Sequence, residues 1–235
     1  MDSTILFWNC RGATSDVFLN SLLNMLRRHN PTILLLVKTR TQEYRAGTIL
    51  SNSQLDFVAI SEVSGHVGGI WTFWSSTKIN IQVASIFDQV IVSLVLKGQK
   101  VDWMLTPIYV SPHSVVRSGL WQCTMKLRQC NNVPWLLVGD MNQHLDNRHK
   151  KGGNKVHWRR SQELQDVLDE RSILDIGFSG PKYTHRLTEG LQSQDTRKSR
   201  SLQRQYNTYL EPIQKGDRET FELKCHGLTR LVLQR

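Results

Sequence analysis

Four apolar stretches of the sequence end in polar residues that could carry chemistry. The stretches read FWNCRG, VKTR, IYVSPHS and LLVGDMN, and the polar residues are Asn9, Lys38, Tyr109, Asp140 and Asn142. In α/β sheets, ligands and catalytic groups collect at the carboxyl ends of strands, so these residues could converge on one shallow pocket. Each stretch alone has an ordinary explanation, because Asn commonly follows a strand in a turn and Gly-Asp is a common turn pair. Their order and spacing together indicate a site.

Lys38 stands directly after an unbroken apolar run. Ile33–Val37 follows Asn30-Pro31 and is typical of a strand that is buried on both faces. Packing alone gives no reason for a cation at the end of such a strand. We therefore expect Lys38 to report either on the function of the site or on the loss of that function.

The elements that must position these residues follow an α/β pattern. Residues 4–8 form a predicted strand, 16–28 an amphipathic helix and 33–37 the next strand. Further strands, interrupted by turn residues, are predicted as an antiparallel meander at 57–60, 69–74, 79–85, 90–96 and 101–109. Helices at about 114–129 and 160–170 alternate with apolar segments at PWLLVGDMN and ILDIGFSGPKYT. Helices outside strands predict an α/β sandwich.

The composition indicates one globular domain followed by a tail. Hydrophobic residues make up 39% and charged residues 21%, with seven Trp, which is ordinary for a packed core. From Arg186 the sequence is polar, so we predict a domain at 1–185 and a poorly ordered basic tail at 186–235. The final FELKCHGLTRLVLQR is apolar enough for a short helix or strand.

The net charge indicates the class of partner. The cysteine spacing and the lack of targeting segments indicate the cellular compartment. The net charge of +10 favours a polyanionic partner, with nucleic acid first and an acidic membrane surface second. No signal peptide or membrane-spanning stretch is recognisable, and the four cysteines lack CxxC spacing. We expect an intracellular protein, nuclear or cytoplasmic, that binds no membrane. Neither a P-loop nor a nucleophile elbow is present. No small-molecule cofactor is expected.

The ordered motifs resemble the endonuclease/exonuclease/phosphatase superfamily, the fold of deoxyribonuclease I and the abasic-site endonucleases. The closer resemblance is to the endonuclease domain of plant non-LTR (LINE-type) retrotransposons. It covers residues 5–185 and is carried by ILFWNCRGA, HNPTILLLVKTR, GGIWTFWSS, IYVSPHSVVRSGLW, PWLLVGDMNQHLDNRHKKGG and ILDIGFSGPKYTH. The resemblance implies a deoxyribonuclease I-like, four-layer sandwich of two mixed β-sheets flanked by helices.

The resemblance also implies roles for the residues at the strand ends. In the family, the Asn of the first strand and a Glu after the second help to hold Mg²⁺, and Asn9 matches that Asn. The family's Tyr contacts the scissile phosphate, and the Asp and Asn of GDxN position the attacking water and the transition-state oxygens. Tyr109, Asp140 and Asn142 match these positions, with Asp140 also beside the metal.

Two departures from the family predict impaired catalysis. Lys38 stands where the family has its metal-binding Glu, a change of two charge units beside the metal, and Lys offers only hydrogen-bond donors. The late Ser-Asp-His of the family is not recognisable after PKYTH, so the domain looks incomplete at its C-terminal end; in KCHG, Cys225 precedes His226 where Asp would be needed. Mg²⁺ binding is therefore doubtful. One hypothesis follows: Lys38 forms an ion pair with Asp140 and fills the metal position with its own ammonium group.

A basic segment offers a contact for nucleic acid. Residues 147–160, NRHKKGGNKVHWRR, contain no acid, and their glycines let the backbone approach a strand of phosphates. The candidate contacts are Arg148, Lys150, Lys151, Lys155, Arg159 and Arg160. The alternative is a solvated basic loop.

Three functions follow from these observations. The first is a retrotransposon-type endonuclease-like domain that binds DNA but is catalytically impaired, and the second is a surviving Mg²⁺-dependent nuclease. The third is a non-catalytic basic module that binds nucleic acid, with a non-functional transposon remnant as the plainest alternative. Phosphodiester hydrolysis of this type depends on the metal ion, so a plasmid-nicking assay with and without Mg²⁺ separates the first two.

Overall fold

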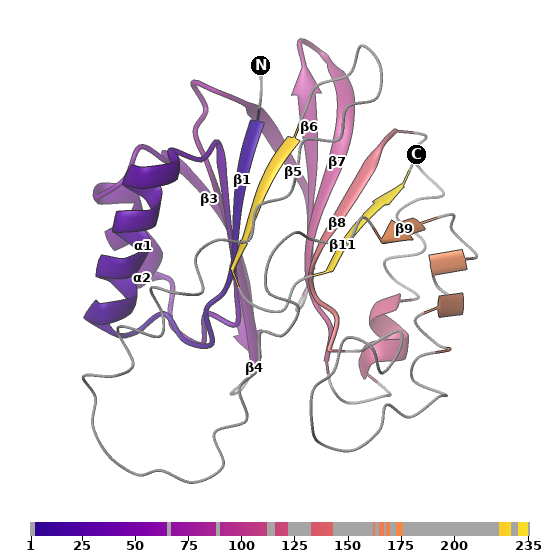
Figure 1. The fold of residues 1–235 in the computed structure, drawn as a ribbon, viewed down its shortest axis with the longest axis horizontal. Coiled ribbons are helices and arrows are strands. Elements are labelled where there is room, and N and C mark those ends of the chain that lie inside the picture. Colours follow the sequence, from indigo (N-terminus) through magenta and orange to yellow (C-terminus); the bar gives the residue numbers. More distant parts are fainter. Residues whose placement is uncertain are drawn as a thin grey trace, which may run out of the picture.

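The computed structural model describes residues 3–64, 67–87, 90–111, 116–121 and 133–142, single positions between 162 and 169, and the strands at 173–175, 221–226 and 230–234. Within these residues the chain forms two β-sheets that pack face to face (Figure 1). No helix among them is both long and apolar enough to cross a membrane.

The first sheet has the strand order β10-β1-β2-β4-β3. Its strands are β1 (Ser3–Asn9), β2 (Ile33–Val37), β3 (Phe57–Ser64), β4 (Val67–Trp74) and β10 (Phe221–His226). β1 runs parallel to both of its neighbours, whereas β4 is antiparallel to β2 and β3. The carboxyl ends of β1 and β2 therefore lie at the same edge of a mixed sheet.

The second sheet has the order β5-β6-β7-β8-β11-β9. Its strands are β5 (Asn80–Phe87), β6 (Val90–Lys97), β7 (Lys100–Tyr109), β8 (Trp135–Asp140), β9 (Ile173–Asp175) and β11 (Arg230–Gln234). β7 and β8 are parallel, and the other pairs are antiparallel. This parallel pair sends two carboxyl ends to a common edge, as the parallel strands of the first sheet also do.

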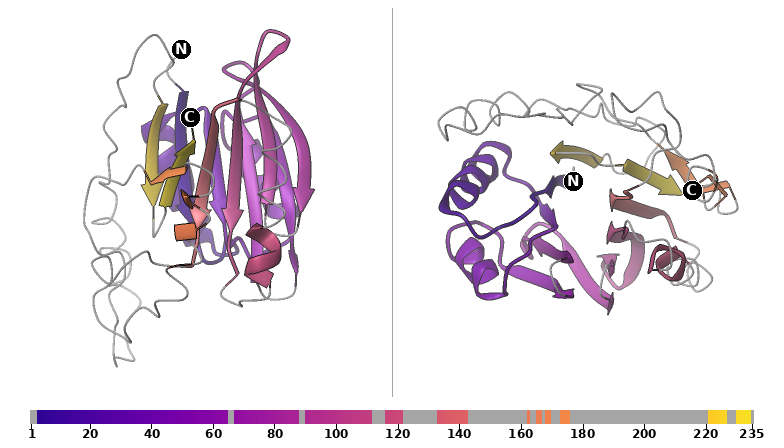
Figure 2. Two further views of the ribbon diagram at one scale, coloured as in Figure 1. Left: turned by 90° about the vertical axis from the view of Figure 1, so that its right-hand side faces the viewer. Right: turned by 90° about the horizontal axis from the view of Figure 1, so that it is seen from below.

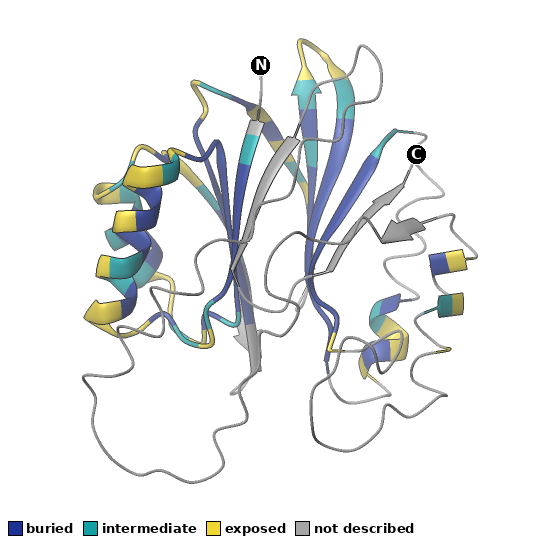
Figure 3. Ribbon diagram, viewed as in Figure 1, coloured by how far each residue is buried: buried dark blue, intermediate teal, exposed yellow. Residues whose placement is uncertain are grey.

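Three layers of apolar side chains hold the sheets and helices together. One layer lies between the sheets, a second lies between the first sheet and its helices, and a third covers the outer face of the second sheet around Trp121 and Leu168. The view from below shows helices, sheet, sheet and helix in succession (Figure 2). Most of the described strand residues that face these layers are buried, and the outward faces of the helices are exposed (Figure 3). The predicted four-layer sandwich of two mixed sheets is confirmed.

β2 is apolar throughout and β1 is apolar from Ile5 to Trp8, because both faces of these strands are covered. Ile5 and Phe7 of β1 belong to the layer between the sheets, whereas Leu6 and Trp8 pack under the helices. Side chains in a strand alternate between the two faces, so a strand covered on both sides needs apolar residues at every position. This explains the unbroken run Ile33–Val37, which is buried along its whole length.

Two helices cover the outer face of the first sheet. α1 (Asp16–His29) begins after Ser15, whose hydroxyl accepts a hydrogen bond from Phe18 N, and ends at the left-handed Asn30. α2 (Tyr44–Ser51) is shorter and buries Ala46 and Ile49. Because α1 returns antiparallel to β1, its first turn lies at the edge where β1 ends and its last turn lies at the opposite edge.

Most predicted elements lie close to the observed ones, and one difference has a physical basis. The predicted meander is not one sheet, because β3 and β4 belong to the first sheet while β5, β6 and β7 belong to the second. Hydrophobic patterning identifies strands but not the sheet they join. The final apolar segment forms strands, β10 beside β1 and β11 between β8 and β9. The predicted boundary at residue 185 stays a prediction.

Candidate functional site

The carboxyl ends of β1, β7 and β8 bring three predicted site residues into the layer between the sheets. Asn9 continues the alternation of Ile5 and Phe7, and Asp140 continues that of Leu136 and Val138, while Tyr109 itself belongs to this layer. Tyr109 and Asp140 are partners in the parallel pairing of β7 with β8. Asn9 and Asp140 come from different sheets, so their contact joins the two sheets at this edge.

Lys38 reaches the same layer by a break in the strand alternation. Leu36, two residues earlier, packs under the helices, and regular strand geometry would send Lys38 to the same side. The backbone of Lys38 is instead left-handed, with φ of 59°. This turn of the chain directs its side chain toward the second sheet, where it meets Asp140.

The carboxylate of Asp140 is the centre of the site. Its Oδ2 accepts a hydrogen bond from Lys38 Nζ at 2.7 Å and a second from Asn9 Nδ2 at 2.8 Å. The side chains of Lys38 and Asp140 are 12% and 10% exposed, so the ion pair is largely shielded from water. The predicted ion pair between Lys38 and Asp140 is confirmed.

Asn142 and Tyr109 complete the surroundings of this ion pair. Asn142 N donates to the second carboxylate oxygen, Asp140 Oδ1, at 3.0 Å, and Asn142 Nδ2 donates to Val110 O at 2.6 Å. Lys38 Nζ also lies 4.8 Å from the centre of the Tyr109 ring, in a cation–π arrangement. The site thus contains all five polar residues expected at the strand ends.

Cys10 fixes the backbone beside Lys38, a role that the sequence analysis missed. Its thiol donates to Val37 O at 3.2 Å and lies 3.6 Å from Lys38 O. Burial raises the pKa of the Cys10 thiol to about 12, and the nearby positive charge of Arg40 opposes this shift only weakly. The thiol therefore stays protonated and remains a hydrogen-bond donor at neutral pH.

Gly139 is a second residue that the sequence analysis missed, because Gly-Asp was weighed as a turn pair. Gly139 and Asp140 instead lie inside β8. A Cβ atom at position 139 would come within 1.8 Å of Ile108 O on the neighbouring strand β7. The absence of a side chain at this position lets β7 and β8 approach closely and places Asp140 beside Tyr109. A glycine inside a strand pattern was the available signal.

The donor set does not fit the Mg²⁺ of the family. Mg²⁺ requires hard oxygen ligands, usually including one or two carboxylates. Asn9 Oδ1 is buried and accepts no hydrogen bond within the described part of the chain, and it could serve as one such oxygen. The carboxylate of Asp140, however, already binds an ammonium group. No cluster of three or more His, Cys, Asp or Glu side chains suited to a metal occurs among the described residues.

The comparisons with known proteins rest on structure alone. No protein-family model matches the sequence, and no curated protein matches it. The endonuclease domain of TRAS1, a telomere-specific non-LTR retrotransposon, superposes with a TM-score of 0.58 and 14% identity over 98% of this chain and 96% of that domain. An AP endonuclease from Archaeoglobus fulgidus has a TM-score of 0.57 and 14% identity, covering 100% of this chain and 87% of its own.

A third solved structure agrees with these two. The AP endonuclease LMAP from Leishmania major has a TM-score of 0.57 and 12% identity over 72% of this chain and 67% of that chain. The chain has the endonuclease/exonuclease/phosphatase fold. At these identities the similarity shows the fold of the superfamily, and the predicted roles of the site residues stay predictions.

Two further groups of predicted residues remain predictions. The basic segment with Arg148, Lys150, Lys151, Lys155, Arg159 and Arg160 lies outside the described residues. His226, which the sequence analysis weighed against the catalytic His of the superfamily, lies in β10 and is paired with Trp8.

Proposed function

We propose that this chain is a retrotransposon-type endonuclease-like domain that binds DNA and hydrolyses phosphodiesters poorly or not at all. The observation that carries the proposal is the contact of 2.7 Å between Lys38 Nζ and Asp140 Oδ2. By resemblance, position 38 is that of a metal-binding glutamate. An ammonium group there both removes one carboxylate and occupies the other. The plant LINE origin remains part of this proposal.

The charge balance of the site explains why hydrolysis should fail. Phosphodiester hydrolysis in this superfamily relies on a metal ion to polarise the phosphoryl group and to generate the nucleophile. Lys38 can attract a phosphate but can neither generate a hydroxide nor accept a proton in its charged form. The oxygen atoms of Asp140 already accept hydrogen bonds from Asn9, Lys38 and Asn142. The site therefore combines a fold suited to DNA with a carboxylate whose oxygen atoms are already hydrogen-bonded to other protein groups.

Two other functions have weaker support, and experiments can distinguish them from the first. A surviving nuclease would use Asn9, Asp140 and Asn142 around Mg²⁺, and it would first have to displace Lys38 from Asp140. A purely nucleic-acid-binding module is favoured by the net charge of +10. That module would bind with steep salt dependence, and its affinity for nucleic acid would fall when Lys150, Lys151, Arg159 and Arg160 are replaced.

A non-functional remnant would have only a marginal fold, so a cooperative unfolding transition would argue against it.

A plasmid-nicking assay with and without Mg²⁺ tests the proposal. We expect the wild-type protein to convert no supercoiled plasmid to the nicked form above the protein-free background. The Lys38→Glu variant restores a second carboxylate, and we expect at most weak Mg²⁺-dependent nicking from it, because the Ser-Asp-His motif is also missing. Nicking by the wild type that requires Mg²⁺ and disappears in Asp140→Ala would overturn the proposal in favour of the surviving nuclease.

A melting experiment supplies a readout that does not depend on activity. A ligand that binds only the folded state raises the melting temperature, and the stabilisation grows with the logarithm of the ratio of ligand concentration to Kd. We expect Mg²⁺ to leave the melting temperature of the wild type unchanged and to raise that of Lys38→Glu. The Lys38→Gln variant is the matched control, because it removes the ammonium group without adding a carboxylate. A Mg²⁺-dependent rise in the wild type would contradict the argument from the donor set.

A further inference from the structure

Lys38 and Asp140 have the arrangement of a nucleophile and its base. Lys38 Nζ lies 2.7 Å from Asp140 Oδ2, so a proton can pass directly from the ammonium group to the carboxylate. The carboxylate is itself held in place, by Asn9 Nδ2 at 2.8 Å on the same oxygen and by Asn142 N at 3.0 Å on the other. A nucleophile within hydrogen-bond reach of a base that further groups orient is the geometry of covalent catalysis.

The chain places the amine of Lys38 here through an unfavourable backbone conformation. Lys38 has φ of 59°, in the left-handed region that favours Gly or Asn. In regular strand geometry its side chain would lie under the helices, on the side of Leu36. The thiol of Cys10 contacts the carbonyl oxygens of Val37 and Lys38 and so holds this turn. Residues held in sparsely populated conformations cluster at functional sites, which points to a role for this amine.

Two neighbouring groups suit an amine that attacks a carbonyl carbon. Asn9 Oδ1 is buried and accepts no hydrogen bond from the described part of the chain. Such an acceptor can bind the hydroxyl group that forms when an amine adds to a carbonyl, and a purely structural ion pair would leave it unexplained. The ring of Tyr109, with its centre 4.8 Å from Lys38 Nζ, stabilises a cation at this nitrogen. The side chains of Lys38 and Asp140 stay 12% and 10% exposed, so the pair is not sealed from solvent.

We propose that Lys38 forms a Schiff base with an aldehyde, that Asp140 transfers the protons, and that no metal ion takes part. Lysine amines form Schiff bases with carbonyl substrates when a neighbouring group activates them. Two sources offer the same chemistry, the ring-opened sugar of an abasic site in DNA and a free sugar aldehyde. The DNA source rests on the proposed function, whereas the free aldehyde does not.

The reaction balances with the groups at the site. Asp140 takes one proton from the ammonium group, and the lone pair of Lys38 Nζ forms a bond to the aldehyde carbon. A second proton moves from Nζ to the former carbonyl oxygen, which becomes a hydroxyl group. Asp140 returns its proton to this hydroxyl group, the C–O bond breaks and water leaves. The product is a protonated imine with the same single positive charge as the ammonium group, so no oxidant or reductant is required.

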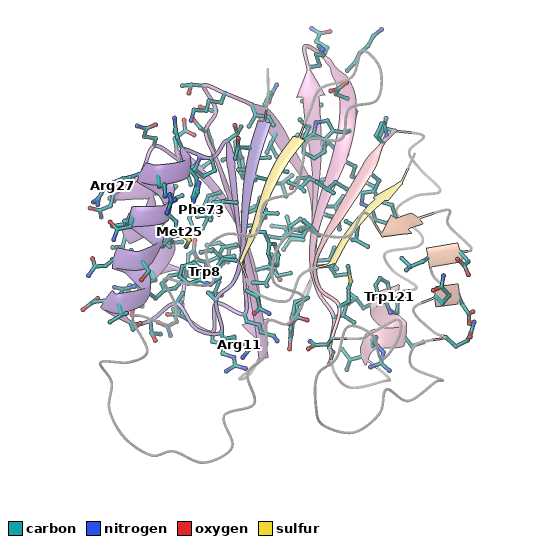
Figure 4. The ribbon with its side chains drawn as sticks, in the orientation of Figure 1. Trp8, Arg11, Met25, Arg27, Phe73 and Trp121 are labelled. Carbon is teal, nitrogen blue, oxygen red and sulfur yellow. The ribbon has the colours of Figure 1, made fainter. Side chains whose placement is uncertain are left out.

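Lys78 offers a matched control at the opposite edge of the first sheet. It is half-buried like Lys38, and its Nζ donates to Asn30 Oδ1 at 2.7 Å and to Asn30 O at 3.4 Å. Both of these acceptors are neutral, so neither takes a proton as a carboxylate does. Figure 4 shows that the two edges are well separated, with Arg11 after β1 at one and Arg27 in the last turn of α1 at the other.

The test traps the imine in EDTA with cyanoborohydride, which reduces it to a stable amine. The probes are a fluorescent DNA duplex with a single abasic site and free deoxyribose phosphate. We expect a covalent adduct of the wild type, detected by intact mass and assigned to Lys38 by peptide mapping. Lys38→Arg keeps the charge but should lose the adduct at this position, whereas Lys78→Arg should form as much as the wild type. Asp140→Asn should slow trapping roughly a hundredfold, because it removes the proton acceptor.

The other outcomes separate this inference from the proposed function, which binding of an intact duplex reports independently. A protein that binds the duplex but gives no adduct with either probe would overturn the inference alone. An adduct with deoxyribose phosphate from a protein that binds no DNA would support the inference and overturn the proposed function. Adducts spread over other lysines, or formed equally by Lys38→Arg, would reject Lys38 as the nucleophile. Peptide mapping of the wild type decides the question even if Lys38→Arg loses its melting transition.

Discussion

Two donors converge on one oxygen of Asp140, and this arrangement decides what its carboxylate can do. Lys38 neutralises the charge and Asn9 adds a hydrogen bond to the same oxygen. A carboxylate that is largely buried is costly unless it is paired, so removing either partner leaves an uncompensated polar group. At the scale of single residues, Lys38 thus acts as an internal counter-ion that stabilises the junction of the two sheets.

A double-mutant cycle with Lys38→Met and Asp140→Asn measures this interaction. Because both side chains are largely shielded, we expect a coupling energy of about 1 to 3 kcal/mol in urea unfolding. The control cycle uses Arg45 and Asp16, whose atoms are 2.9 Å apart but whose Asp16 side chain is 89% exposed. Solvent screening should reduce that coupling to about 0.2 to 1 kcal/mol. Equal couplings in the two cycles would show that burial adds nothing to the Lys38–Asp140 pair.

The ends of the strands form a group of unusual backbone conformations. Arg11, Lys38, Arg40 and Asn142 have positive φ values and all follow strands at the site. A left-handed conformation costs a non-glycine residue about 1 to 2 kcal/mol. The strands meet closely enough to determine these turns, and the close approach of β7 and β8 at Gly139 is part of that constraint. At the scale of elements, the site depends on how the strands end.

Gly139→Ala should disrupt this arrangement. The added methyl group would meet the backbone carbonyl of Ile108, which cannot move without separating β7 from β8. We expect a loss of about 3 kcal/mol or more in the free energy of unfolding, or a failure to fold.

The control for that variant is Gly47→Ala in α2, where a Cβ atom would meet nothing within 4 Å. Alanine is favoured over glycine inside a helix, so we expect a gain of about 0.5 to 1 kcal/mol. Chemical denaturation followed by tryptophan fluorescence measures both variants. A Gly139→Ala protein as stable as the wild type would show that β7 and β8 can separate without cost.

At the scale of the whole molecule, residues 221–234 add one strand to each sheet. β10 covers the edge of β1, and β11 lies between β8 and β9. Unpaired strand edges expose backbone donors and acceptors that favour aggregation. The two strands that carry Asn9 and Asp140 are therefore the ones that gain partners from residues 221–234.

Shortening the chain to the predicted domain, residues 1–185, tests the contribution of these strands. We expect a lower melting temperature and increased light scattering, because β1 and β8 each lose a partner. Val232→Pro in the full chain is a milder version, since it removes a backbone donor from a strand that has neighbours on both sides. A shortened protein that melts cooperatively at the same temperature as the full chain would instead support the predicted boundary at 185.

The sequence determined the positions of most strands and the residues at their ends. Apolar runs and turn residues are local signals, so β1, β2, β7 and β8 could be predicted within a few residues. The motifs at their ends indicated the superfamily fold and singled out Lys38. The ion pair itself could be proposed from charge alone, because a lysine takes the position of a metal ligand beside an aspartate.

Only the tertiary structure decided how these ends meet. Asn9 and Lys38 are 131 and 102 residues away from Asp140 along the chain, so no local pattern fixes their distances. The tie of Cys10 to Val37 joins neighbouring strands of the first sheet, and the close approach at Gly139 joins β8 to β7 within the second. The contacts of Lys38 and Asn9 with Asp140 depend on packing one sheet against the other. The alternation of side chains along a strand determines the face of the sheet on which each one lies. The residue that it contacts across the layer depends on which sheet each strand joins.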